Sequence, residues 1–207
     1  MTGLVVRDGA PVEAGVTVKL EDQTYAIVVT ATTDAQGCYT FANLTAPGLL
    51  SALGPGFNVL FAQEWNEQYD VGDVVSWAWM GPLTISRGTT VEVPDFEISL
   101  LGFEQVTPSS GASFSAADIS PQNPVTFEWA PYPAASAYWV DLTKGDDLNR
   151  VWQSTLVDTT HVDFDGTLED DSHVTADTYW WGVGARKGVG DYQLTVYGYL
   201  PTLLIAP

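Results

Sequence analysis

The chain has 207 residues, with 7 lysines and arginines against 26 aspartates and glutamates and a formal net charge of −19. Its 45% hydrophobic and 12% aromatic content excludes an acidic disordered tail, because such tails cannot bury enough apolar surface to offset their chain entropy. The acidity also argues against nucleic acid as a partner, since a phosphate backbone is bound through lysine and arginine.

Membrane insertion and disulfide bonding are not expected. No stretch approaches the roughly 20 consecutive apolar residues of a membrane-spanning helix. Residues 1–6 enter a strand-like run directly, without the features of a signal peptide. Cys38 is the only cysteine, so no intrachain disulfide can form.

The first half of the chain has the two-residue period of β-strands. Apolar and polar residues alternate over residues 16–21, which predicts a strand with one face in a core. A β-branched run at residues 25–33 and a strand at residues 39–41 flank a short loop, predicting a hairpin with Gly37 at positive φ. Further strands are predicted at 57–62, 74–80, 83–86 and 90–100.

The same period continues in the second half, over residues 125–129, 138–143 and 179–186. Residues 107–111 form the most turn-like segment near the middle, and we place a domain boundary just before it, near Leu101. The predicted fold class is all-β, with two consecutive antiparallel β-sandwich domains over residues 1–101 and 102–207.

Two segments of the first half carry a family resemblance. Residues 3–18, beginning Gly-Leu-Val-Val-Arg-Asp-Gly, and residues 33–44, Thr-Asp-Ala-Gln-Gly-Cys-Tyr-Thr-Phe-Ala-Asn-Leu, resemble the carboxypeptidase regulatory-like domain. That family consists of transthyretin-like β-sandwiches common in bacterial exported and surface proteins. The resemblance covers about the first fifty residues and fades over residues 56–82.

The second half resembles a fibronectin type III-like domain. Residues 124–129, 137–142 and 178–185 match strands B, C and F of that family. The resemblance implies an immunoglobulin-like sandwich in which strands C and F are neighbours in one sheet. It implies little about function, because such folds host many roles.

Catalytic and cofactor motifs are missing from the sequence, so we predict no catalytic residue, metal or cofactor. The two histidines, His161 and His173, belong to no metal-binding motif, and no nucleophile elbow or phosphate loop occurs. The acidic segment 163–171 has two interpretations. It can hold calcium through alternating oxygen ligands, although its spacing is not that of an EF-hand, or it is a solvated loop.

The candidate binding or interface residues are aromatic. If Tyr138 and Tyr179 face the core, strand alternation turns Trp139 and Trp180 outward onto one surface, beside bare backbone at two glycines. The complete predicted set is Trp139, Trp180, Trp152, Tyr197 and Tyr199.

Three hypotheses remain open for this stripe. The rings can stabilise the sheet face, pack against another domain, or stack on a sugar ring. Trp129 and Trp181 are assigned to the second core. Trp77 and Trp79, with Trp65 nearby in sequence, are expected to form a core pair in the first half.

The predicted function is a non-enzymatic structural, adhesion or assembly module of a bacterial exported or surface protein. Its partners would be neighbouring domains or surface proteins, and it would lie outside the cell or at the cell surface. The alternative is a carbohydrate-binding module that recognises a polysaccharide through exposed tryptophans.

Overall fold

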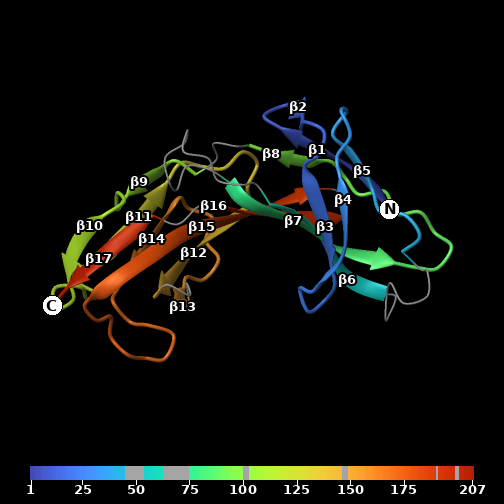
Figure 1. The fold of residues 1–207 in the computed structure, drawn as a ribbon. Coiled ribbons are helices and arrows are strands. Elements are labelled where there is room, and N and C mark those ends of the chain that lie inside the picture. The colour runs from blue at the N-terminus through green and yellow to red at the C-terminus, as the bar shows by residue number, and fades with distance from the viewer. Residues whose placement is uncertain (45–53, 63–74, 100–102, 146–148, 190, 199–200) are drawn as a thin grey trace. The chain divides into compact units, whose positions relative to one another are not determined.

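The computed structural model describes residues 1–44, 54–62, 75–99, 103–145, 149–189, 191–198 and 201–207. All regular elements within these ranges are β-strands (Figure 1), which confirms the all-β class. The chain divides into two compact units, each assembled from three stretches of chain. Unit 1 comprises Met1–Glu64, Ser76–Leu100 and Lys187–Val196, and unit 2 comprises Trp65–Val75, Leu101–Arg186 and Tyr197–Pro207.

One sheet of unit 1 is centred on β1 (Thr2–Arg7). This strand pairs antiparallel with β2 (Ala10–Pro11) and β5 (Cys38–Thr40) and parallel with β8 (Phe96–Ile98). Val5 at its centre is fully buried in the core, whereas the other residues of the strand are partly exposed.

The other sheet of unit 1 has the order β16, β7, β6, β3, β4. The bounds of these strands are Tyr192–Gly198 for β16, Val75–Ile85 for β7, Gly54–Ala62 for β6, Thr17–Glu21 for β3 and Ile27–Thr32 for β4. The predicted alternation over residues 16–21 is confirmed, because Val18 and Leu20 are buried in the core while Lys19 lies on the opposite face. The predicted strands at 74–80 and 83–86 form the single strand β7.

The predicted hairpin around Gly37 is wrong in its pairing. Gly37 has φ +75°, and the Asp34 carboxylate accepts hydrogen bonds from the backbone N–H groups of Gln36 and Cys38. The strands on either side nevertheless belong to different sheets, because β5 pairs with β1 rather than with β4. The turn residues therefore predicted the chain reversal correctly, but they did not identify the strand with which β5 pairs.

Trp77 and Trp79 do not form the expected core pair. Ala78 and Met80 occupy the core positions of β7 and are fully buried. Alternation along the strand turns both tryptophans to the outward face of the sheet, where Trp77 is 37% exposed and Trp79 is half-buried. Trp65 lies outside the described residues.

Unit 2 contains a large sheet and a three-stranded sheet. In the large sheet, β12 (Ala137–Lys144) lies between β13 (Asn149–Gln153) and β15 (Asp177–Val189). The sheet continues through β17 (Thr202–Ala206) to β10 (Ala112–Ser115). The three-stranded sheet has the order β14 (His161–Phe164), β11 (Val125–Trp129), β9 (Gln105–Thr107).

Aromatic side chains fill the core between the two sheets of unit 2. The Phe127 ring lies 4.8 Å from that of Trp181, and the Trp129 ring lies 5.6 Å from that of Tyr138, measured between centroids. Trp129 and Trp181 are both buried, which confirms their assignment to this core. Such rings supply much of the buried apolar area of a sandwich.

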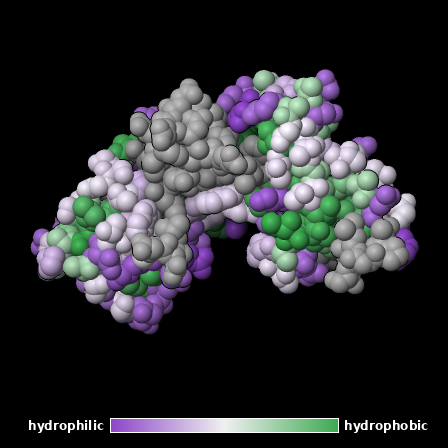
Figure 2. Space-filling view, in the orientation of Figure 1, coloured by the Kyte–Doolittle hydropathy of each residue, from purple (hydrophilic) through white to green (hydrophobic). Residues whose placement is uncertain are grey.

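The two predicted strands that carry Trp139 and Trp180 are direct neighbours. β12 and β15 pair antiparallel, with Val140 opposite Val183 and Leu142 opposite Trp181. No helix among the described residues is long and apolar enough to cross a membrane. Figure 2 shows hydrophobic residues gathered in one patch on the unit that contains β3 and β7, with hydrophilic residues around it.

Candidate functional site

The outward face of the β12–β15 pair carries the predicted aromatic stripe. Trp139 lies directly opposite Gly184 in the register, and Trp180 lies directly opposite Thr143. Directly opposed residues of an antiparallel pair share a sheet face, and both pairs lie on the face away from Val140 and the core. The structure thus places Trp139 and Trp180 on one side of the sheet.

The Trp139 indole packs on bare backbone. A Cβ atom built on Gly184 would collide with the Cζ2, Cε2 and Cη2 atoms of this ring, so the close approach requires glycine. Trp139 is only 9% exposed. This aromatic-over-glycine pair is the geometry of the first hypothesis, in which the stripe stabilises the sheet face.

The polar edge of Trp139 is also bonded within unit 2. Its Nε1–H donates to Oδ2 of Asp141 at 3.0 Å, and the side-chain amide of Gln153 donates to Oδ1 of the same carboxylate at 2.6 Å. The Tyr197 hydroxyl is hydrogen-bonded to Asp141 as well. Asp141 therefore joins three segments of unit 2, because these side chains come from β12, from β13 and from the last residues of β16, which belong to unit 2.

Tyr197 remains a neutral hydrogen-bond donor at all ordinary pH values. Burial, followed by the negative charge of Asp141 and the hydrogen bond to it, raises the pKa of this phenol well above its usual value. Its ring centroid lies 6.3 Å from that of Trp139. The Arg186 guanidinium carbon lies 5.2 Å from the Trp139 ring centroid, within cation–π range.

Trp152 does not belong to the outward stripe. It lies directly opposite the core residue Leu142, so it points into the sandwich. Its ring lies 4.9 Å from Phe164 and 6.2 Å from Phe127, between centroids. The register between β12 and β13 shifts at the step from Leu142 to Thr143, and sequence alternation alone does not reveal such a shift.

Trp180 and Tyr199 are the other residues of the predicted stripe. Trp180 is half-buried, and its backbone carbonyl accepts a hydrogen bond from the Thr143 hydroxyl at 3.3 Å. Tyr199 lies outside the described residues. Sequence reasoning did not select Asp141, Gln153 or Arg186. Alternation does place Asp141 on the face of Trp139, but the register that brings Gln153 to it was not readable.

The acidic segment 163–171 uses its carboxylates within its own turns. Asp165 accepts a hydrogen bond from the Thr167 backbone, and Asp170 accepts two from the backbone and hydroxyl of Ser172. The hydrogen bonds from Ser172 lower the pKa of Asp170. Across the described ranges, no three His, Cys, Asp or Glu side chains are grouped to hold a metal ion.

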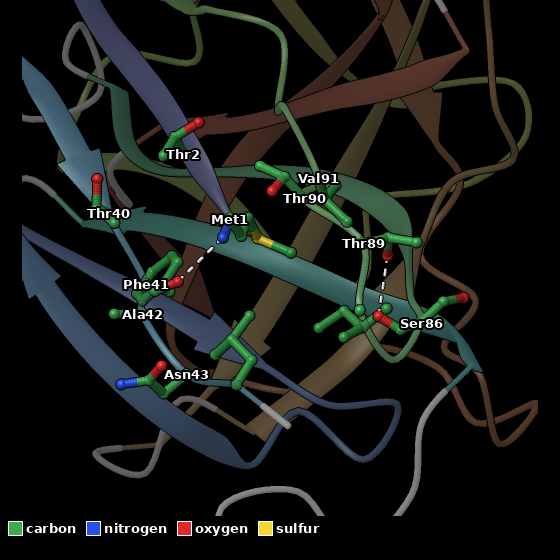
Figure 3. Close-up of a pocket in the computed structure, with 13 residues that line it drawn as sticks. Met1, Thr2, Thr40, Phe41, Ala42, Asn43, Ser86, Thr89, Thr90 and Val91 are labelled. Atoms are coloured by element: carbon green, nitrogen blue, oxygen red, sulfur yellow. Dashed lines mark hydrogen bonds between the residues drawn. The ribbon is translucent and has the colours of Figure 1, made fainter. Parts of the chain in front are cut away.

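A pocket of about 360 Å³ lies in unit 1 beside the first residues of the chain (Figure 3). The Met1 amino group donates to the Phe41 carbonyl at 3.0 Å, and the Thr89 hydroxyl donates to the Ser86 carbonyl at 2.9 Å. The side chains that line it include hydroxyls but no carboxylate, imidazole or lysine.

Comparison with known proteins gives little. No family model matches the chain, and no curated protein matches it. A solved structure from Bacteroides uniformis, described as a "putative carbohydrate binding protein", is similar to it at 11% sequence identity. That similarity covers 98% of this chain and 97% of the other at a TM-score of 0.31, which is too low to assign a shared fold or ligand.

Proposed function

We propose that the chain is a non-enzymatic structural or adhesion module, built from β-sandwich units, of a bacterial exported or surface protein. The observation that carries this proposal is the internal packing of Trp139. An indole that stacks on a flat ligand needs an exposed ring face and a polar edge available to solvent. Trp139 is 9% exposed, and Asp141 already accepts its N–H.

The rest of unit 2's outward face supports the same role. Asp141 ties together β12, β13 and β16 through side-chain hydrogen bonds, an arrangement that fixes strand positions. Trp152 is turned into the core. Recognition of a polysaccharide by this stripe is therefore less well supported than stabilisation of the sheet.

The chain's charge and family resemblances support the location and the partners that we propose. A net charge of −19 favours solubility and repels other acidic surfaces. The resemblances to a carboxypeptidase regulatory-like domain and a fibronectin type III-like domain favour a site outside the cell or at its surface. Neighbouring domains or surface proteins are the expected partners.

The experiment is affinity electrophoresis of the whole chain through gels containing different polysaccharides. Wild type is compared with a variant that carries both Trp139→Ala and Trp180→Ala. The proposal expects any retardation to be the same for both proteins once the variant is shown to be folded by circular dichroism. Retardation that disappears in the folded variant would contradict it.

A further inference from the structure

The strand β4 forms one end of the larger sheet of unit 1. It pairs with β3 on one side (Figure 1), and no described strand pairs with its other side. With six residues it is the longest edge strand that the structure describes, since the others have between two and five. An edge strand of this length presents a row of backbone groups to which another strand can bind.

The register identifies the backbone groups of β4 that face away from β3. The Thr33 N–H donates to the Val16 carbonyl at 2.9 Å, so the odd-numbered residues of the regular register direct their N–H and C=O groups toward β3. Thr30 and Thr32 therefore direct theirs to the open side, and both residues are exposed. A register shift leaves Val28 as an extra residue, so the regular edge begins after it.

The core of unit 1 is incompletely covered along this edge. Val18 and Leu20 of β3 are fully buried, yet their register partners Ala31 and Val29 are only half-buried. A further strand along β4 would cover apolar area on both of these side chains in addition to forming backbone hydrogen bonds. The edge thus offers a binding strand two separate sources of stabilisation.

The absence of charge distinguishes this edge from the rest of the chain. Residues 23–33 contain no charged residue and no proline, in a chain whose net charge is −19. Charges and proline on an edge oppose the addition of a strand. Among the other described edge strands, β2 contains Pro11, β13 contains Arg150 and β14 contains Asp163. The edge of β4 is therefore the one best suited to bind a strand.

The same property indicates the chemistry of the partner. A strand rich in lysine or arginine would find no carboxylate along β4, and a strand rich in aspartate or glutamate would bring like charge to an acidic chain. The matching strand is uncharged and β-branched and has an open edge of its own, and β4 itself has these properties. We infer that two copies of the chain pair antiparallel through β4, about a two-fold axis.

The open backbone groups fix the register of this pair, with the axis at Ala31. Thr30 of each copy then lies opposite Thr32 of the other, and the two residues exchange both of their open hydrogen bonds. Asp34 lies opposite Val28 rather than opposite a second carboxylate, so no like charges face each other. The pair is closed, because each copy uses its only β4 edge. The inference goes beyond the proposed structural role and uses no residue of the aromatic stripe.

The first test is sedimentation velocity of the whole chain over a range of concentrations, at low and high sodium chloride. A concentration-dependent dimer is expected, and salt should strengthen it because screening weakens the repulsion between two acidic copies. Thr30→Pro removes an open N–H group without removing a bond to β3, and it should weaken the dimer about tenfold or more. The matched control Thr30→Val keeps the N–H group and should dimerise like wild type.

The second test is disulfide crosslinking in a Cys38→Ser background, which removes the natural thiol. Ala31→Cys places two thiols across the axis, and mild oxidation should join the two copies. Thr24→Cys lies in the exposed turn between β3 and β4, far from the axis, and should not crosslink. This measurement decides the inference even if circular dichroism shows that Thr30→Pro is unfolded.

Three results would overturn the inference. The first is a wild-type monomer at every concentration and salt, which would leave the edge to a strand of another protein. The second is a dimer that a folded Thr30→Pro variant does not weaken. The third is crosslinking of Thr24→Cys that is as efficient as crosslinking of Ala31→Cys.

Discussion

The outward sheet face of each unit places a tryptophan beside a carboxylate, and the two carboxylates differ in how completely they are hydrogen-bonded. In unit 2, Trp139 donates its N–H to Asp141, and Gln153 donates to the second oxygen of that carboxylate. In unit 1, the Trp79 side chain opposes the rise in the pKa of Glu21 that burial causes, and Oε2 of Glu21 has no partner among the described residues. The carboxylate of unit 2 is therefore more completely hydrogen-bonded than that of unit 1.

Exposure divides the two faces in the same way. Trp139 is 9% exposed and rests on Gly184, whereas Trp77 is 37% exposed. A ring held against a glycine contributes mainly to the stability of its sheet. A partly exposed ring contributes less to stability.

Trp139→Ala should have the largest effect on stability. It removes the ring that covers Gly184 and leaves Asp141 without one donor, so we expect a loss of about 3 kcal/mol. Equilibrium unfolding in urea measures it, with Trp180→Ala as the matched control on the same face. A loss no larger than that of the control would remove the distinction between the two faces.

Gly184→Ala tests the close packing from the other side. The added methyl group meets the Trp139 ring, and we expect a loss of about 2 kcal/mol. In a Trp139→Ala background the same change should cost almost nothing, because the methyl group fills space that the ring has left. Additive losses in this double-mutant cycle would show that the two residues are not coupled.

Trp77→Ala should change the free energy of unfolding by under about 1 kcal/mol, as is usual for exposed positions. The comparison predicts a much smaller loss of stability than for Trp139→Ala. Equilibrium unfolding in urea of both variants measures the difference. A large loss of stability would place Trp77 with the structural rings.

Glu21→Gln should change how the thermal midpoint depends on pH more than it changes the midpoint at low pH. Because burial raises the folded pKa of Glu21 above its ordinary value of 4.5, its contribution to stability is complete below that value and is lost as pH rises through the folded pKa. The thermal midpoint of Glu21→Gln should therefore rise relative to wild type with increasing pH. Parallel profiles for the two proteins would contradict the burial of an unpaired carboxylate.

Alternation along the strands predicted which side chains share a face, but not which strands meet. It correctly assigned Trp129 and Trp181 to a core, and it placed Trp139 and Trp180 together. The prediction that Trp152 extends the outward stripe was wrong, because Trp152 lies directly opposite the core residue Leu142 and shares its face. The register that sets this pairing depends on the partner strand, which the local sequence does not identify.

The tryptophans of β7 show a second limit. Apolar side chains occupy both faces of residues 75–85, so the period alone did not reveal which face meets the core. The sheet brings Trp79 of β7 and Lys19 of β3, sixty residues apart in sequence, to either side of Leu60. Long-range pairing of this kind arises from the complete sheet and leaves no short motif.

The division of the chain into units has a consequence for how the protein can be cut. Lys187–Val196 belongs to unit 1 although it follows most of unit 2 in sequence. Within unit 1, the Lys187 Nζ atom lies 3.8 Å from Oε2 of Glu97. A fragment that stops near residue 101 would lack β16 and leave β7 as an unprotected sheet edge, open to aggregation. Unit 1 is therefore complete only when the chain extends through β16.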